Sequence, residues 1–293
     1  TPHGAASEIA RAALAAGKST DVFGNCSGSG GATIIDGGGL YQVYKATAGG
    51  SLNNLVLQNA NWSGGDGGGL YLTNPTAFSL QKVIIQNNAV TGAGNGAGIY
   101  FGGSGPLNIF DSIIRNNSTI GTGQGGGIYA ISSGSLNITN SVISNNSTSS
   151  LGGGISFNSP NGCNFSSVSF LNNTSSGSGA GAIYFTNASP INITHANFDS
   201  NQATGATGTG GAIYYGGSGS MNISASNFSS NTANSGGALT QFSGTININQ
   251  SSIIGNTASG TFTGGGALYL SAGTVNIANS TLVANKASSI SGS

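Results

Sequence analysis

The chain has 293 residues, among them 53 glycines, six Lys or Arg and six Asp or Glu, and its formal net charge is zero. So few basic residues cannot neutralise a phosphate backbone, which excludes nucleic acid as a partner. No run of 18 apolar residues occurs, which excludes a membrane-spanning helix.

Residues 1–30 differ in composition from the rest of the chain. Ser7 is a good N-cap residue, Glu8 follows in the first turn, and Gly17 is typical of a helix end, so we expect a short helix over residues 7–16. A solenoid needs a cap over its terminal edge. We therefore assign residues 1–30 to an N-terminal segment with a capping helix.

From residue 31 to residue 293 one phrase recurs at nearly even spacing: a glycine cluster, then Ile or Leu, then usually Tyr. Its apolar residue stands at Leu40, Leu70, Ile99, Ile128, Ile155, Ile183, Ile213, Leu239 and Leu268. A period of about 28 residues over almost the whole chain is typical of a solenoid.

Two further phrases keep the same period. In one, an apolar residue is followed three positions later by Asn, as in Val56 to Asn59 and Ile143 to Asn146. In the other, two apolar residues flank a polar one, mostly Asn, as in residues 191–193. Each period therefore holds three short segments of strand character, separated by Gly, Ser, Asn and Thr.

Three strands per period predict an all-β fold, in which residues 31–293 form a parallel β-helix of about nine to ten coils. At roughly 4.8 Å per coil, nine coils make a rod on the order of 43 Å long. A leucine-rich repeat is the alternative solenoid, but the chain lacks its helices and its Leu-x-x-Leu-x-Leu pattern.

The alternation also predicts which side chains face inward. One buried column should consist of Leu52, Phe78, Leu107, Leu136, Cys163, Ile191, Met221, Ile246 and Val275. A second should contain Ile99, Ile128 and Ile183, and a third Ile143, Phe170, Phe198 and Phe228. The Asn that ends the apolar-x-x-Asn phrase should lie in a tight turn, with left-handed backbone angles, and bond to its counterparts in neighbouring coils. Asn117, Asn146 and Asn173 are then expected to face inward.

Tyr follows the apolar residue of the glycine phrase in most coils, including Tyr41. If Ile and Leu face inward, these Tyr face outward as a stripe that is interrupted at Ser156 and Thr240. Its candidate members are Tyr71, Tyr100, Tyr129, Tyr184, Tyr214 and Tyr269. Stacked Tyr rings can simply shield the sheet. Alternatively, they offer a flat aromatic platform for sugars or for neighbouring rods.

A second outward row consists of Asn108, Asn137, Asn164, Asn192, Asn222, Asn247 and Asn276. This row can bind a polar periodic partner, carry glycans, or only satisfy itself through amide ladders. The sequence holds sixteen N-x-Ser/Thr motifs, and glycans on outward Asn would solubilise a surface with so little charge. The candidate glycosylation sites are Asn61, Asn137, Asn192, Asn222, Asn249 and Asn279.

The groups that catalysis needs are dispersed. The acidic residues are Glu8, Asp21, Asp36, Asp66, Asp111 and Asp199. Asp111 and Asp199 should lie three coils apart, roughly 14 Å at the standard strand spacing, which is too far for a pair of catalytic carboxylates. His195 with Asp199, near Arg115, is the best local group, and we interpret it as a solvated surface trio. No His or Cys spacing fits zinc, so we expect no catalytic, cofactor or metal site.

The two cysteines, Cys26 and Cys163, should lie several coils apart, too far for a disulfide. Cys163 replaces an aliphatic residue in the first buried column. We therefore interpret it as a buried apolar side chain and not as a reactive thiol.

The repeats resemble those of chlamydial polymorphic membrane proteins, which carry GGA(I/L/V) and FxxN motifs in their passenger domains. The GGA motif stands at residues 210–213, 236–239 and 265–268, and FxxN stands at residues 170–173, 198–201 and 228–231. The resemblance extends over about residues 31–287. It implies a right-handed β-helix, export from the cell and adhesion at a cell surface. The early coils depart from it with GGG or GAG, and several FxxN are IxxN.

Together these features predict a non-catalytic, secreted structural or adhesive protein. It would form filaments or a surface layer, or attach through its regular faces and an uncovered C-terminal edge. Its partner would be itself or cell-surface glycans, and its location extracellular, in keeping with a first residue other than Met. A carbohydrate-binding module that uses the Tyr stripe is the alternative, and a polysaccharide lyase or hydrolase is a further one.

Overall fold

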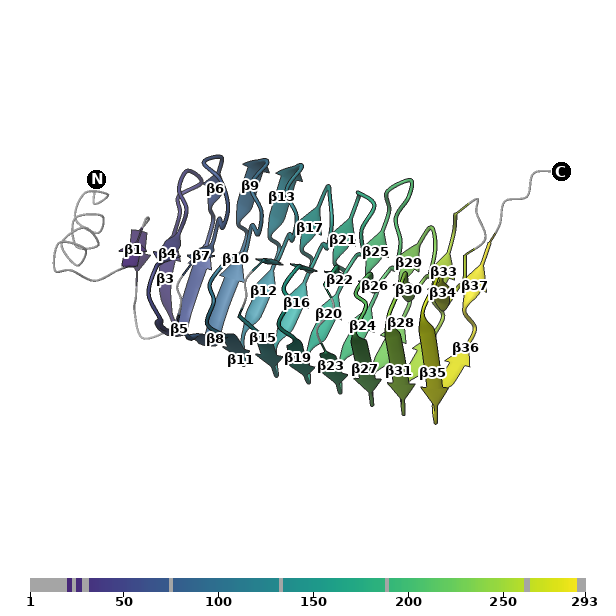
Figure 1. Ribbon diagram of the computed structural model, residues 1–293. Helices are drawn as coiled ribbons and strands as arrows, with labels where there is room; N and C mark the ends of the chain where they lie inside the picture. Colours follow the sequence, from purple (N-terminus) through teal and green to yellow (C-terminus); the bar gives the residue numbers. More distant parts are fainter. Residues whose placement is uncertain are drawn as a thin grey trace.

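The computed structural model describes residues 20–22, 25–27, 32–73, 76–131, 134–187, 190–260 and 264–288. Every regular element in these ranges is a β-strand and none is a helix. The predicted capping helix at residues 7–16 lies outside the described residues. The strands stack along one axis, so that the chain winds into an elongated solenoid (Figure 1).

The first of three sheets, sheet A, has ten strands in chain order, parallel except for β1, which runs antiparallel to β4. They are β1 (Thr20–Val22), β4 (Tyr44–Ala46), β7 (Leu70–Leu72), β10 (Ile99–Phe101), β14 (Ile128–Ala130), β18 (Ile155–Phe157), β22 (Ile183–Phe185), β26 (Ile213–Tyr215), β30 (Leu239–Gln241) and β34 (Leu268–Leu270).

Sheet B follows each strand of sheet A and bends at its middle. It begins with β2 (Asn25–Ser27), β3 (Thr33–Asp36), β5 (Gly50–Gln58) and β8 (Phe78–Gln86). From the third coil on, the bend separates two strands: β11 (Leu107–Phe110) and β12 (Ile113–Arg115), β15 (Leu136–Thr139) and β16 (Val142–Ser144), β19 (Cys163–Ser166) and β20 (Ser169–Leu171), β23 (Ile191–Thr194) and β24 (Asn197–Asp199), β27 (Ser220–Ser224) and β28 (Asn227–Ser229), β31 (Thr245–Asn249) and β32 (Ser252–Ile254), β35 (Thr274–Ala278) and β36 (Thr281–Val283).

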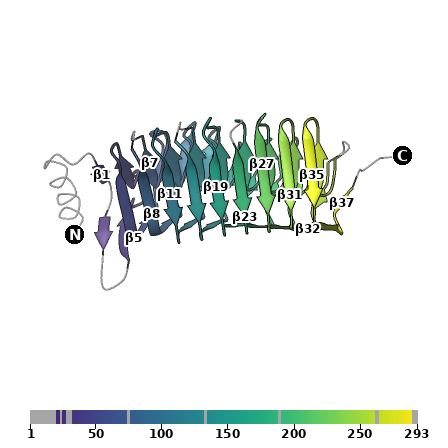
Figure 2. The same cartoon turned by 60° about the horizontal axis from the view of Figure 1, so that its bottom comes forward.

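Sheet C completes each coil with a short strand. Its nine parallel strands are β6 (Asn61–Trp62), β9 (Ala89–Gly92), β13 (Ser118–Gly121), β17 (Ser147–Thr148), β21 (Thr174–Ser175), β25 (Gln202–Ala203), β29 (Thr232–Ala233), β33 (Thr257–Ala258) and β37 (Lys286–Ala287). From β4 to β34 the chain makes about eight turns of the solenoid, slightly fewer than the nine to ten coils predicted. Figure 2 shows the strands of sheet B side by side along the rod.

The buried columns of the middle coils confirm the predicted inward positions. Leu107, Leu136 and Cys163 pair in register along sheet B, as do Ile99 and Ile128 along sheet A. In the third column the rings of Phe170 and Phe198 stack with centroids 4.7 Å apart and planes 3° apart. Like side chains therefore stack directly on one another, which is how each coil buries its apolar surface on its neighbours.

The first coil departs from the predicted register. Leu52 lies opposite Leu80, whereas Gly50 takes the place opposite Phe78, so Leu52 belongs to the neighbouring column. It still faces inward, because residues two apart in a strand share a face. The predicted phrase from Val56 to Asn59 is also displaced by one residue, because Leu57 is the residue that pairs with Ile85.

The first glycine phrase was wrongly assigned to a strand of sheet A. Residues 37–41 form a turn, in which Leu40 is 67% exposed and Tyr41 lies on the surface. The strand begins at Tyr44, which lies opposite Leu70. Lys45, and not Tyr41, therefore stands at the start of the Tyr column.

From the second coil on, the glycine cluster forms a crowded corner. Gly125 has a φ of 66°, a conformation that side chains with a Cβ rarely adopt. A Cβ on Gly127 would lie 2.5 Å from the carbonyl oxygen of Gly154 in the next coil. The backbone angle therefore requires glycine at position 125, whereas some later coils have alanine at the position of Gly127, as at Ala182 and Ala212.

The left-handed residue at the other corner is not the one predicted. Asn116 has a φ of 54°, whereas Asn117, which ends the phrase, follows it. The left-handed residue turns the chain so that the side chain after it points into the solenoid. Asn117 is fully buried there, which confirms the predicted inward position.

Candidate functional site

The inner Asn column is a continuous, buried amide ladder. Asn117 Nδ2 donates to Asn146 Oδ1 at 3.0 Å and to the carbonyl oxygen of Ile85 at 3.0 Å. Asn146 repeats this pattern with Asn173 and Ile114. The ladder runs through Asn88, Asn117, Asn146, Asn173, Asn201, Asn231, Asn256 and Asn285. Because its donors and acceptors are paired along the axis, this column stabilises the corner and offers little to a ligand.

The outer Asn row forms a second ladder on the surface of sheet B. Asn137 Nδ2 donates to Asn108 Oδ1 at 3.0 Å, and Asn164 Nδ2 donates to Asn137 Oδ1 at 2.9 Å. The same bond continues through Asn192, Asn222, Asn247 and Asn276. Of the three roles considered for this row, the geometry matches self-satisfying amide ladders.

The candidate glycosylation sites fall into three settings. Asn137, Asn192 and Asn222 belong to the outer ladder, where each Nδ2 already donates to the preceding coil. Asn279 donates to Asn249 in a shorter ladder of the same kind. Asn61 lies exposed in β6, and its side-chain amide forms no hydrogen bond within the described residues.

The Tyr stripe forms along sheet A in two stacks. In the first, Tyr71 and Tyr100 have ring centroids 5.0 Å apart, and Tyr100 and Tyr129 lie 5.7 Å apart. In the second, Tyr184 and Tyr214 lie 4.4 Å apart with ring planes 13° apart. The ring faces therefore contact one another, and mainly the ring edges and hydroxyls are left for a partner.

The first end of the stripe and its interruptions are also in contact with other side chains. The Lys45 ammonium lies 5.5 Å from the ring centroid of Tyr71. Ser156 is buried and donates to Gln124 Oε1 at 2.9 Å. Near the second interruption, the ring of Phe242 lies 5.3 Å from that of Tyr214. These contacts leave few open ring faces for stacking on a sugar.

Burial raises the pKa values of some phenols in the stripe. Burial, the Asp66 carboxylate and the neighbouring Tyr rings raise the pKa of Tyr100 to about 12. Burial and the adjacent Tyr214 raise the pKa of Tyr184 to about 12. Both phenols therefore stay neutral well above neutral pH, and neither is activated as a proton donor.

The structure does not bring the side chains of His195, Asp199 and Arg115 together as one group. Asp199 Oδ1 accepts a hydrogen bond from Ser229 Oγ at 2.7 Å. Arg115 lies in the same column three coils away, where it donates to Gln86 Oε1. His195 lies instead at the bend of sheet B, with a φ of 53°.

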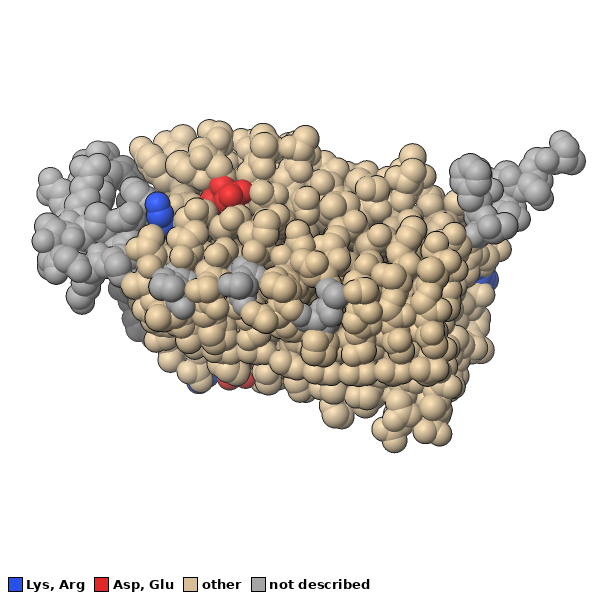
Figure 3. Space-filling view, viewed as in Figure 1, with Lys and Arg blue, Asp and Glu red and all other residues tan. Residues whose placement is uncertain are grey.

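Metal and thiol chemistry receive no support within the described ranges. No group of three His, Cys, Asp or Glu side chains there could hold a metal ion. Cys163 is buried, and burial raises the pKa of its thiol, which suits an inert core side chain. Charged side chains are sparse on the face shown in Figure 3. The described part of the chain also has no helix long and apolar enough to cross a membrane.

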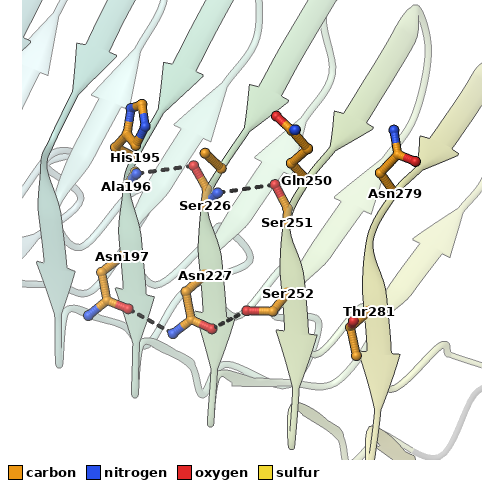
Figure 4. Close-up of a pocket in the computed structure, with 11 residues that line it drawn as sticks. His195, Ala196, Asn197, Ser226, Asn227, Gln250, Ser251, Ser252, Asn279 and Thr281 are labelled. Carbon is orange, nitrogen blue, oxygen red and sulfur yellow. Dashed lines mark hydrogen bonds between the residues drawn. The ribbon is translucent and has the colours of Figure 1, made fainter.

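The structure has one feature that sequence reasoning missed, a groove along the bend of sheet B near its C-terminal end. This corner groove has a volume of about 440 Å³. Figure 4 shows its two walls, one formed by His195, Gln250 and Asn279, the other by Asn197, Asn227, Ser252 and Thr281. Ala225 also lines the groove. Ala196, Ser226 and Ser251 line it between the walls.

Hydrogen bonds along the axis shape this groove. Ser226 Oγ accepts from the backbone amide of Ala196 at 3.1 Å, and Asn227 Nδ2 donates to Asn197 Oδ1 at 2.9 Å. Ser252 Oγ donates in turn to Asn227 Oδ1 at 2.7 Å. In the sequence, the groove corresponds to polar residues two positions after the bend, such as Asn197 and Asn227. Within one coil, such a residue looks like any other polar surface residue.

Comparison with known families matches the architecture. The family model for the right handed beta helix region matches residues 97–292, well over half of the chain. Searches of curated proteins and of solved structures returned no match.

Proposed function

The chain belongs to the right-handed β-helix family, and from this premise we propose that it is a non-catalytic, secreted structural and adhesive element. It associates with further copies of itself at or near a cell surface. The observation that carries this proposal is the regularity of its faces. The outer Asn ladder alone continues over seven coils from Asn108 to Asn276.

A repeating face of this kind favours contacts between copies. The same side chain recurs at each coil, so two rods that lie side by side can repeat one contact many times. With only six positive and six negative residues in 293, the surface lacks the charge that normally keeps protein molecules apart. Both features support lateral association.

The rival functions receive less support from the geometry. Sugar binding on the Tyr stripe needs open ring faces, and most of these rings contact one another. Polysaccharide cleavage needs two carboxyl groups close together. Asp111 instead shares a hydrogen bond with Asn140, and Asp199 shares one with Ser229, at different columns of sheet B.

Sedimentation and electron microscopy over a range of concentrations test the proposal. We expect the chain to form larger species as its concentration rises. Nearly uncharged faces can associate without charges of opposite sign on the partner. Asn192→Asp with Asn222→Asp adds like charges to the outer ladder and should weaken lateral contacts.

Asn61→Asp, an exposed change outside the outer ladder, is the matched control and should leave association unchanged. A chain that stays monomeric at every concentration would contradict the proposal. So would association that none of the surface changes affects.

A further inference from the structure

Two hydrogen-bonding atoms inside the solenoid have no partner among the described residues. They are the hydroxyl oxygen of Tyr215, Oη, and the side-chain amide oxygen of Gln241, Oε1. Both side chains are fully buried. Tyr215 in β26 lies directly opposite Gln241 in β30, so the two polar side chains enter the core from neighbouring coils. Buried polar atoms in native structures bond to protein or to ordered water, because an unpaired one costs free energy.

The column that holds this pair is otherwise apolar. Its other members are Ala46, Leu72, Phe101, Ala130, Phe157, Phe185 and Leu270. Aliphatic and aromatic side chains therefore fill this position along the rest of the described rod. A tyrosine and a glutamine in adjacent coils are not needed for stacking, so their polar atoms require a separate explanation.

The corner between sheets A and B is shaped around both side chains. A Cβ on Gly217 would lie 2.9 Å from Tyr215 Cε2, and a Cβ on Gly273 would lie 2.6 Å from Gln241 Nε2. Gln241 Nε2 donates to the carbonyl oxygen of Gly244 at 2.8 Å. This bond fixes the amide, because turning it over would place Oε1 against a carbonyl oxygen. Oε1 thus faces away from that carbonyl and needs a donor of its own.

Water is the group that suits both atoms. The amide oxygen only accepts hydrogen bonds, whereas the hydroxyl needs an acceptor for its proton, and water both donates and accepts. Burial raises the pKa of Tyr215, so its hydroxyl keeps this proton. A cation would find no compensating charge, because the buried polar side chains of the described ranges are all neutral.

We propose that Tyr215 and Gln241 form an internal hydration site. Ordered water inside the solenoid accepts a hydrogen bond from Tyr215 Oη and donates one to Gln241 Oε1. At this column, β26 and β30 are thus joined by hydrogen bonds through water, where the other coils have apolar contacts. The inference goes beyond the proposed assembly and does not depend on it, because both side chains lie in the core.

A crystal structure of the full chain, at a resolution that defines ordered water, tests the inference. We expect water within about 3 Å of both Tyr215 Oη and Gln241 Oε1. Phe157 and Phe185, whose ring centroids lie 5.7 Å apart in the same column, provide the internal control, and the space around them should be dry. A protein group bonded to either polar atom in place of water, or no density beside either atom, would overturn the inference.

Tyr215→Phe tests the site in solution. It removes only the hydroxyl and repeats the residue found at Phe185 in the preceding coil. The change breaks the bond to water, so the midpoint of urea unfolding should fall. If the hydroxyl had no partner, its removal would instead relieve a buried polar atom and raise the midpoint. Tyr41→Phe, at an exposed ring, is the control and should leave the midpoint unchanged.

An unchanged or higher midpoint in Tyr215→Phe would therefore contradict the hydration site. The double change Tyr215→Phe with Gln241→Leu removes both polar atoms and repeats the residues of the same column at Phe185 and Leu270. Its crystal structure should show a dry column between β26 and β30. Water that persists there would be held by other groups, and the assignment to this pair would be wrong.

Discussion

At the residue scale, burial gives the same side chain two different roles. Asn173 and Asn164 belong to one coil, and each forms amide bonds to both neighbouring coils. Asn173 is fully buried and also donates to the carbonyl oxygen of Ile143. Asn164 is exposed, where water can replace its partners. The inner ladder should therefore matter far more for stability.

Asn173→Ala and Asn164→Ala test this difference with one chemical change. Removing Asn173 leaves buried donors and acceptors of Asn146, Asn201 and Ile143 without partners, which should lower the free energy of unfolding by roughly 2–4 kcal/mol. Asn164→Ala should lower it by less than about 1 kcal/mol. Urea unfolding measures both values, and equal losses would refute the division into inner and outer ladders.

At the element scale, the strands of sheet A stack Tyr rings whose hydroxyls resist ionisation. The pKa of Tyr100 and of Tyr184 lies at about 12 in the folded chain, against an ordinary value of 10.0. The folded state thus holds these protons more tightly than the unfolded state does. This contribution to stability is complete below pH 10 and is lost as the pH rises from about 10 to about 12.

We therefore expect the chain to lose stability between pH 10 and pH 12. Tyr100→Phe with Tyr184→Phe keeps both rings in their stacks but removes the ionising hydroxyls, so it should reduce the alkaline loss. Urea unfolding of both proteins at several pH values over this range measures the effect. If the two proteins lose stability in parallel, other groups cause the alkaline unfolding.

At the scale of the whole molecule, each coil contacts only the coils on either side of it. The strand pairings run from one coil to the next, as in β30 with β26 and β34. Stability is then a sum of similar interfaces between neighbours. The described part of the rod should therefore tolerate the loss of its last coil.

A chain shortened to residues 1–260 tests this expectation. It lacks β34 to β37, and β30 with β31 to β33 becomes the exposed edge. We expect the earlier coils to keep their strand content and their slow amide exchange, with faster exchange in β30 and β31. Circular dichroism and hydrogen exchange measure these properties, and collapse of the whole rod would show that the last coil is indispensable.

Much of the solenoid could be predicted from the sequence, because its pattern repeats in register. The alternation around Ile193 and the phrase ending at Asn173 place each residue inside or outside, and every middle coil has the same neighbours. The first coil could not be predicted so well. There the Gly37 cluster forms a turn and β5 pairs with a shift, because its packing partners do not follow the repeat.

The sequence by itself therefore determined the parallel β-solenoid, its buried columns and its inner Asn ladder. These depend on spacing and alternation, which are local properties that each coil repeats. Only the tertiary structure decided how the Tyr rings cover one another, how the outer amides pair, and where the corner groove lies. These features arise between coils, from side chains far apart in the sequence whose directions are set by the bend of each strand.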